Sequence, residues 1–314
     1  MKKTFIMGTV LAIVMMLTPL AVQGKGGKNE EKTVETVAMP QTEKAKYNDT
    51  FRILNTKTKE INVISAKDYI YGVVASEMPA LYEEEALKAQ AVASYTYACY
   101  KKNMNKDKEY DLTDDFSLDQ CYATEENLKE KWGENWEEYS KKIRTAVDAV
   151  EGETLTYRDA PILAVYHALS SGYTYSAKDV WGKDIEYLKG AVSKSDTLEE
   201  NYITVKEFSE KEIKKCFEYK KGEEVFGKSE SNSKGLVEKI LVYGKELTGN
   251  EVRSKLGLPS ANFTVAEKEG EYVFTCKGYG HGVGMSQKGA NSMAKQGFTY
   301  KEILLHYYNG VKLE

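Results

Sequence analysis

The 314-residue sequence has few of the residues that build common metal and nucleophile sites, with only 3 histidines and 4 cysteines. The cysteines form no Cys-x-x-Cys pair, so a structural zinc site of the usual spacing is not supported. No Gly-x-Ser-x-Gly elbow is present, and no Gly-Lys-Ser/Thr follows the glycine-rich segment 278–284, which excludes a phosphate-binding loop of the usual type. The net charge of −4 argues against a nucleic-acid partner, and no motif indicates a bound cofactor.

Hydrophobic residues make up 41% of the chain and charged residues 29%, so a globular core is feasible. Tyrosine is abundant, with 23 tyrosines against 9 phenylalanines. A tyrosine ring packs on the apolar face of a sugar while its hydroxyl forms hydrogen bonds, although ordinary cores and strands use tyrosine as well. The sequence shows no internal repeat.

The N-terminus carries the one long apolar run. Lys2 and Lys3 precede an uncharged stretch from Phe5 to Val22, which is typical of a signal-peptide core or a short membrane anchor with its lysines inside. Residues 25–47 are polar and predict a disordered tether. We therefore expect an anchor or signal segment at 1–24, the tether at 25–47 and a folded domain at 48–314.

The folded part predicts an α+β class, with helices and antiparallel hairpins mixed and no βαβ repeat. Strands are expected at 51–54 and 60–64, and Ser65 with Asp68 predicts the start of a helix that runs toward Glu77 and stops at Pro79. A second helix is expected from Glu84 to about Tyr100.

Later segments give clear local signals. Apolar residues three and four apart from Trp132 to Val150 predict one long helix ended by Gly152, with its two tryptophans on a core face rather than on a sugar platform. A hairpin is expected from strands 154–157 and 162–166, and a strand at 272–276. Three more capping boxes predict short helices, at Ser209/Glu212, Thr248/Glu251 and Thr299/Glu302.

Glu77 is the most informative residue of the chain. It is the only charged residue between Asp68 and Glu83, and its neighbours are small or apolar. A partly desolvated carboxyl has a raised pKa and can hold a proton at neutral pH for donation, as a general acid must. The alternative is a solvated glutamate at the end of a helix, and the residues alone leave both open.

Four ordered motifs resemble the stage II sporulation protein D family, whose domain is shared by amidase-enhancer proteins. The first runs from Glu77-Met-Pro79 through Gln90-Ala-Val-Ala-Ser-Tyr95-Thr-Tyr97. The others are Tyr166-His-Ala-Leu-Ser-Ser-Gly172 with Asp179-Val-Trp-Gly182, Thr248-Gly-Asn-Glu-Val-Arg-Ser-Lys-Leu-Gly257, and Gly278-Tyr-Gly-His-Gly-Val-Gly-Met-Ser-Gln-Lys-Gly-Ala290. The resemblance covers the chain from about Phe51 to its C-terminus. It departs at Tyr95, where the family usually has arginine, and at Tyr173, where it has a second glycine.

The resemblance implies a peptidoglycan lytic transglycosylase that acts on glycan strands without stem peptides during engulfment in sporulation, with Glu77 as its catalytic acid. One carboxyl suffices, because it protonates the leaving oxygen and its carboxylate then deprotonates the 6-hydroxyl of the same muramic acid, which closes to a 1,6-anhydro sugar. The resemblance indicates these glycan-binding residues around a cleft: Lys88, Gln90, Tyr95, His167, Ser170, Ser171, Tyr279, His281, Ser286 and Gln287.

Other readings stay open at this point. A cell-wall-binding amidase enhancer without catalysis is the main alternative, and a hydrolase using His167 with Ser170 or Ser171 is a weaker one. Cys121, His167 and His281 are the candidates for a metal site, although a buried thiol is the commoner fate of a lone cysteine. The resemblance also implies an anchored protein whose domain lies outside the cytoplasm, on the mother-cell membrane, and works with an amidase and a membrane partner.

Overall fold

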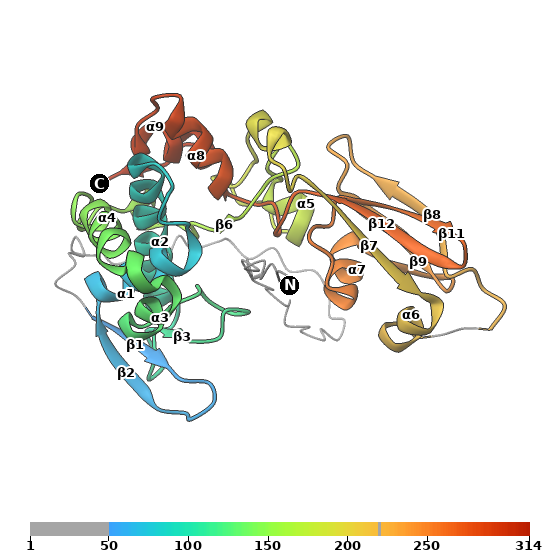
Figure 1. Cartoon of the computed structure of the whole chain (residues 1–314), viewed down its shortest axis with the longest axis horizontal. Helices are drawn as coiled ribbons and strands as arrows, with labels where there is room; N and C mark the ends of the chain where they lie inside the picture. The colour runs from blue at the N-terminus through green and yellow to red at the C-terminus, as the bar shows by residue number, and fades with distance from the viewer. Residues whose placement is uncertain (1–49, 219–220) are drawn as a thin grey trace, which may run out of the picture.

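The computed structural model describes residues 50–218 and 221–314. The expected anchor and tether lie outside these residues. Helices and small sheets, most of them antiparallel, are mixed along the described chain, which confirms the α+β class. Two lobes are visible in Figure 1, one built around the helices α1 to α4 and the other around the strands β7 to β12.

The first lobe begins with the expected hairpin and two helices. Strands β1 (Thr50–Leu54) and β2 (Ile61–Ser65) pair antiparallel, and β3 (Leu112–Thr113) joins β1 in parallel. Helix α1 (Ala66–Glu77) starts where the Ser65 hydroxyl accepts a hydrogen bond from the Asp68 N–H, and it ends just before Pro79. Helix α2 (Glu84–Met104) runs one turn further than predicted, and its buried alanines let α1 and α4 pack closely against it.

The predicted long helix over residues 132–150 is wrong. The segment consists of α3 (Glu125–Trp132), a 3-10 turn η1 (Gly133–Asn135) and α4 (Trp136–Asp148). Gly133 breaks the helix because it adopts a φ of 51°, outside the helical range. Trp132 and Trp136 pack against one another with ring centroids 5.8 Å apart, at the edge of the core as expected.

The predicted hairpin at 154–166 is only partly right. Strands β4 (Leu155–Tyr157) and β5 (Ala160–Pro161) do pair antiparallel, but the turn falls at Arg158 and Asp159, which both have positive φ. Strand β6 (Tyr166–His167) leaves this hairpin and pairs in parallel with β13 (Met285–Ser286). Two of the sequence motifs are therefore neighbours in one small sheet.

A connecting region with α5 (Ala177–Trp181) and the 3-10 turn η2 (Lys194–Leu198) leads to the second lobe. The lobe has two three-stranded sheets, ordered β11-β12-β7 and β10-β9-β8, with helices α6 and α7. Its bounds are β7 Ile203–Ser209, α6 Glu210–Cys216, β8 Phe226–Ser231, β9 Val237–Val242, β10 Lys245–Leu247, α7 Gly249–Leu256, β11 Phe263–Lys268 and β12 Glu271–Lys277. The capping boxes predicted at Ser209 and Thr248 are both present. A separate hydrophobic core that includes Ile213, Val252 and Phe274 fills the lobe.

The chain then returns to the first lobe. Helices α8 (Gln287–Lys295) and α9 (Tyr300–Tyr307) pack on α2, and β14 (Lys312–Leu313) pairs with β4. The capping box predicted at Thr299 and Glu302 opens α9. The second lobe is thus an insertion between two parts of the first, as the colour sequence in Figure 1 shows.

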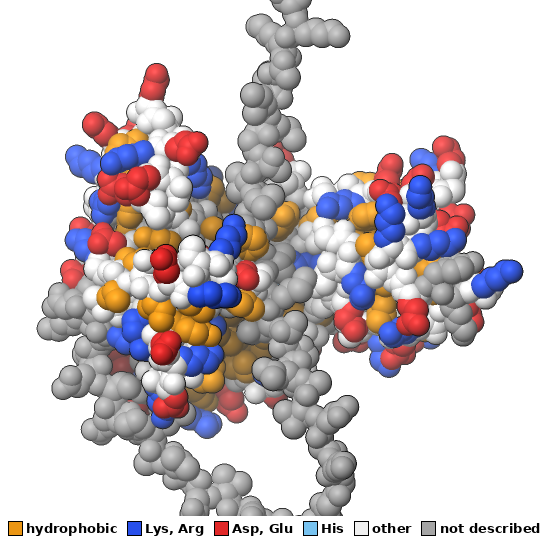
Figure 2. Space-filling view, turned by 90° about the horizontal axis from the view of Figure 1, so that it is seen from below, with side chains coloured by type: hydrophobic (Ala, Val, Ile, Leu, Met, Phe, Trp, Pro, Cys, Tyr) orange, Lys and Arg blue, Asp and Glu red, His pale blue; other side chains and the backbone are white. Residues whose placement is uncertain are grey.

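Charges of both signs are interspersed on the two lobes, and the face seen in Figure 2 has no large patch of one sign. This agrees with the small net charge of −4, and the face in view offers no basic track for a polyanion. Within residues 50–218 and 221–314, no helix has the length and apolar character needed to span a bilayer.

Candidate functional site

A small, partly open pocket lies where the first lobe meets the connecting region. Its walls come from segments far apart in sequence: the end of α1, the loop after β3, strand β6, the loop after β12 and the start of α8. The lining residues are Glu77, Phe116, Asp119, Cys121, Tyr166, His167, Ala168, Tyr279, Gly280, His281 and Gln287. Five of the predicted site residues, Glu77, His167, Tyr279, His281 and Gln287, are brought together here.

Glu77 is the last residue of α1 and is half-buried in this pocket. Its Oε1 accepts a hydrogen bond from the Cys121 backbone N–H at 3.0 Å. Burial raises the pKa of Glu77 to about 7, while the Cys121 N–H, the side chains of Gln287 and Tyr166 and the charge of Lys131 each oppose part of that rise. At neutral pH a large fraction of Glu77 therefore holds a proton that it can donate.

Two buried hydrogen-bond chains support the residues around Glu77. The Tyr166 hydroxyl donates to Gln120 Oε1 at 2.9 Å, and Gln120 Nε2 donates to the Ser94 carbonyl at 3.2 Å. On the other side, Gln287 Nε2 donates to Gln90 Oε1 at 3.4 Å. Gln90, predicted to contact glycan, is fully buried behind Gln287, and its Nε2 also donates to the Ser94 hydroxyl at 3.0 Å.

Asp119 is a second carboxylate in the pocket lining, and no sequence pattern indicates it. Both of its oxygens are engaged: Oδ1 with Lys101 Nζ at 2.7 Å, and Oδ2 with the Thr113 N–H and hydroxyl at 2.9 Å each. Its side chain is almost fully buried. Asp119 therefore anchors the loop that carries Cys121 and has no free oxygen with which to activate a water.

The backbone of Val283 fixes both histidines of the pocket. Its carbonyl lies 3.1 Å from His167 Nδ1, and its N–H donates to His281 Nδ1 at 3.1 Å. His167 therefore carries its proton on Nδ1 and His281 on Nε2. Burial lowers the pKa of His167 to about 4 and that of His281 well below its usual value, so both rings are neutral at pH 7.

The glycine-rich loop 278–284 needs its glycines to lie against the segment of His167. Gly280 has a φ of 111°, and a Cβ there would stand 2.7 Å from the His167 Cβ. At Gly284 a Cβ would stand 1.9 Å from the Val165 carbonyl oxygen. The glycines thus serve the geometry of a tight crossing, and this crossing places Tyr279 and His281 in the pocket wall.

The predicted serines lie outside the pocket lining. Ser286 caps α8, and its hydroxyl donates to Asp196 Oδ2 at 2.7 Å, while the Ser170 N–H donates to the same oxygen at 2.9 Å. The Ser171 hydroxyl lies 2.6 Å from the Tyr175 hydroxyl. His167 contacts Val283 instead of a serine, so the described residues form no Ser–His pair at this position. Asp196, which ties Ser170 to Ser286, gave no signal in the sequence.

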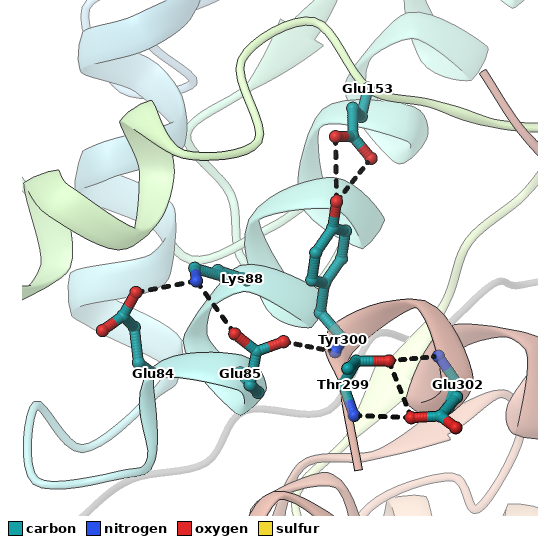
Figure 3. A network of polar contacts seen from close by, with 7 residues as sticks. All are labelled: Glu84, Glu85, Lys88, Glu153, Thr299, Tyr300 and Glu302. Atoms are coloured by element: carbon teal, nitrogen blue, oxygen red, sulfur yellow. Dashed lines mark hydrogen bonds and ion pairs between the residues drawn. The ribbon is translucent and has the colours of Figure 1, made fainter.

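Lys88 and Tyr95 also lie away from the pocket. Lys88 forms ion pairs with Glu84 and Glu85 on its own helix, and Glu85 in turn accepts from the Tyr300 N–H at 2.7 Å, as Figure 3 shows. Tyr95 is fully buried and its ring packs against Phe51. Its side chain fills the core and is not part of the pocket lining, so Tyr95 does not meet a ligand there.

The structure describes all four cysteines and the candidate metal ligands. Cys99, Cys121, Cys216 and Cys276 are all free thiols. Cys121 and His167 both line the pocket, and burial raises the pKa of the Cys121 thiol. In the described parts of the chain, no group of three or more His, Cys, Asp or Glu side chains is arranged to hold a metal ion.

Known proteins are similar to this chain over most of its length. The family model described as stage II sporulation protein matches residues 54–157, the part that holds Glu77, Asp119 and Cys121. The "Stage II sporulation protein D" of Bacillus amyloliquefaciens is 37% identical over 83% of this chain and 77% of its own length. That of Bacillus subtilis is 35% identical over the whole of this chain and 96% of its own length.

The chain belongs to the stage II sporulation protein D family. A more distant relative, the "Amidase enhancer" of Bacillus subtilis, is 26% identical over 77% of this chain and 40% of its own length. Membership identifies a sporulation protein, and the family resemblance expected from the sequence is confirmed. The model matched by residues 54–157 ends before β6, so the wall formed by His167, Tyr279 and His281 comes from outside it.

Proposed function

We propose that this protein is a peptidoglycan lytic transglycosylase with Glu77 as its single catalytic acid and base. The supporting observation is the half-buried Glu77 carboxyl in a pocket, with its pKa raised to about 7 by burial. A protonated carboxyl protonates the oxygen between muramic acid and the next sugar as that bond breaks. The carboxylate that remains takes the proton of the 6-hydroxyl, which attacks the anomeric carbon and closes the 1,6-anhydro ring.

The environment of Asp119 favours this mechanism over hydrolysis. A hydrolytic glycosidase needs a second carboxylate that acts as nucleophile or activates water. Asp119 is the other carboxylate of the pocket lining, and Lys101 and Thr113 occupy its two oxygens. Internal attack by the sugar itself requires neither a second carboxylate nor a bound water.

The pocket also suits a sugar strand. Phe116 lines the pocket and is 44% exposed, so its ring offers an apolar face to a pyranose. Tyr279 and Gln287 add a hydroxyl and an amide for hydrogen bonds to sugar hydroxyls. We place the reaction in cell-wall remodelling during engulfment, on stem-free strands made by an amidase and beside a membrane partner. In this proposal residues 5–22 anchor the chain in the mother-cell membrane. N-terminal sequencing of the mature protein tests this, and a chain that starts near Lys25 would contradict the anchor.

The decisive experiment is product analysis with purified glycan strands free of stem peptides. The protein alone should release fragments that end in 1,6-anhydro-muramic acid, identified by mass spectrometry. Glu77→Gln keeps the shape but removes the proton donor, so the rate should fall at least about a hundredfold. Glu134→Gln, at an exposed carboxylate outside the pocket lining, is the control and should keep the native rate.

Each other outcome has a definite meaning. Fragments with reducing muramic acid ends would show hydrolysis. They would contradict the argument that Asp119, with both oxygens bound, cannot activate a water. Release only after an amidase is added, even from stem-free strands, would favour the amidase-enhancer alternative that the 26% identical relative suggests. Near-native cleavage by a folded Glu77→Gln protein would remove Glu77 from the mechanism.

A further inference from the structure

Arg253 is a buried cation that has no anionic partner among the described residues. It lies on α7, within the motif 248–257, and is 4% exposed. Its Nε–H donates to the Pro259 carbonyl at 3.2 Å, while Nη2 is buried and has no hydrogen-bond partner. No carboxylate of residues 50–218 or 221–314 raises the pKa of Arg253. The groups that do raise it are Tyr279 and Cys276. Arginine is almost never buried unless paired, since an unpaired buried charge is costly.

This cation lies directly behind the pocket wall. The Pro259 carbonyl that binds Arg253 also accepts from the Gly280 N–H at 2.9 Å, and Gly280 lines the pocket. The positive charge of Arg253 contributes to lowering the pKa of both His167 and His281, which line the same pocket. The two rings are neutral and bring no negative charge to pair with it. The pocket therefore has two carboxyls, Glu77 and the Lys101-paired Asp119, and a positive charge behind its histidine wall.

The proposed substrate supplies the missing anion. Muramic acid differs from the other sugar of the strand by a lactyl group on its 3-oxygen. In intact wall this group is joined to the stem peptide as an amide, and removal of the peptide leaves a free carboxylate. The same muramic acid ring reacts at Glu77, so its lactyl group lies within one ring of that residue. Guanidinium binds carboxylate with two charge-assisted hydrogen bonds, which makes arginine well suited to such an anion.

We propose that Arg253 forms a carboxylate-binding subsite of this pocket, and that its ligand is the free lactyl carboxylate of muramic acid. The inference rests on the proposed function and deepens it, because it explains a preference for stem-free strands by charge recognition. A stem peptide would remove the anion as well as crowd the pocket. Arg253 is then a specificity residue supplied by the second lobe.

Binding measurements on the full-length Glu77→Gln protein test this without cleavage. Three ligands of equal length would be compared by calorimetry: a stem-free strand, the same strand with its lactyl groups capped as methylamides, and a chitin oligosaccharide that lacks them. The stem-free strand should bind at least about tenfold more tightly than either of the others, as expected for a charge-assisted pair. Equal affinities for the free and capped strands would overturn the inference.

Substitutions locate the effect at Arg253. Arg253→Gln removes the charge, and the preference for the free carboxylate should shrink to less than about twofold while chitin binding is unchanged. Lys255→Gln removes a charge from the exposed side of the same helix and should keep the native preference. Arg253→Lys keeps the charge without the fork and should retain an intermediate preference. An undiminished preference in a folded Arg253→Gln protein would overturn the inference.

The two proposals can fail separately. Product analysis of the native protein on stem-free strands reports the transglycosylase activity alone, whatever Arg253 does. If Arg253→Gln does not fold, the comparison of free and capped strands on the Glu77→Gln protein still decides the question. Cleavage of free and capped strands at equal rates by the native protein would leave the proposed function standing and reject the subsite.

Discussion

At the scale of single residues, the raised pKa of Glu77 gives a prediction with a definite sign. The acid must start protonated, so cleavage should fall as the pH rises through about 7, the pKa that burial gives Glu77. The same shift affects stability. A carboxyl whose pKa is higher in the folded protein stabilises fully below its ordinary pKa, and this contribution is lost as the pH rises through the folded value.

Glu77→Gln should therefore make the protein more stable than the native chain at pH 8, by up to roughly 3 kcal/mol, with little difference near pH 4.5. Urea unfolding at the two pH values measures this. A native chain that is the more stable of the two at pH 8 would show that Glu77 is well solvated, and would return it to the alternative of an ordinary helix-end glutamate.

The residue scale also shows what the sequence could not reveal. The motifs that contain Glu77, His167 and His281 can be recognised because each is a continuous run of residues. The contact of Glu77 with Cys121 spans 44 positions, and that of Tyr166 with Gln120 spans 46. No periodicity records such contacts. Asp119 was missed for the same reason, since its role depends on Lys101 and Thr113 from other elements.

At the scale of elements, local signals predicted well and non-local pairing did not. The capping boxes at Ser209, Thr248 and Thr299 all open helices, because such a box is closed within four residues. Strand β6 was misplaced because two-residue pairing with β13 depends on a loop more than a hundred residues away. The network of Figure 3, which joins α2 to α9 through Glu85 and Tyr300, was equally hidden.

The close contact of Gly284 with Val165, beside the paired strands β6 and β13, gives the prediction at the scale of elements. In Gly284→Ala the new Cβ would meet the Val165 carbonyl oxygen at 1.9 Å, and the residue keeps a φ of 72°. Both effects should displace His281 and lower the stability by more than about 3 kcal/mol, through clash and backbone strain together. Gly270→Ala is the matched control, with a φ of 84° but no atom within 4 Å of its Cβ.

Gly270→Ala should lower the stability by only about 1–2 kcal/mol, the cost of the left-handed backbone conformation alone. Urea unfolding and cleavage rates would be measured for both variants. Equal losses of stability would show that the loop 278–284 is free to move away from β6, and that the pocket wall is less rigid than the structure shows.

At the scale of the whole molecule, the two lobes have separate cores, and the proposed Arg253 subsite would link the second lobe to the pocket. The second lobe enters at Ile203 and leaves at Lys277, and these two residues are paired in neighbouring strands. Its contacts with the connecting region include the hydrogen bond from Asn262 Nδ2 to the Tyr175 hydroxyl at 2.9 Å and that from Asn250 Nδ2 to the Val180 carbonyl at 3.2 Å. A lobe with its own core and adjacent ends meets the usual conditions for a domain insertion.

Residues 203–277 expressed alone should therefore fold, with a cooperative thermal transition followed by circular dichroism.

The remaining chain, with a short glycine-serine linker in place of the lobe, should keep the α1–α2 core and Glu77 but lose Arg253. Under the proposed subsite it should bind free and capped strands equally, and its cleavage of stem-free strands should fall by at least about tenfold. An unfolded excised lobe would show that the two cores fold only together, because the junction at Tyr175 and Asn262 would then contribute to the stability of both. Native cleavage and native preference for the free carboxylate in the lobe-less chain would instead confine the whole site to the first lobe and its histidine wall.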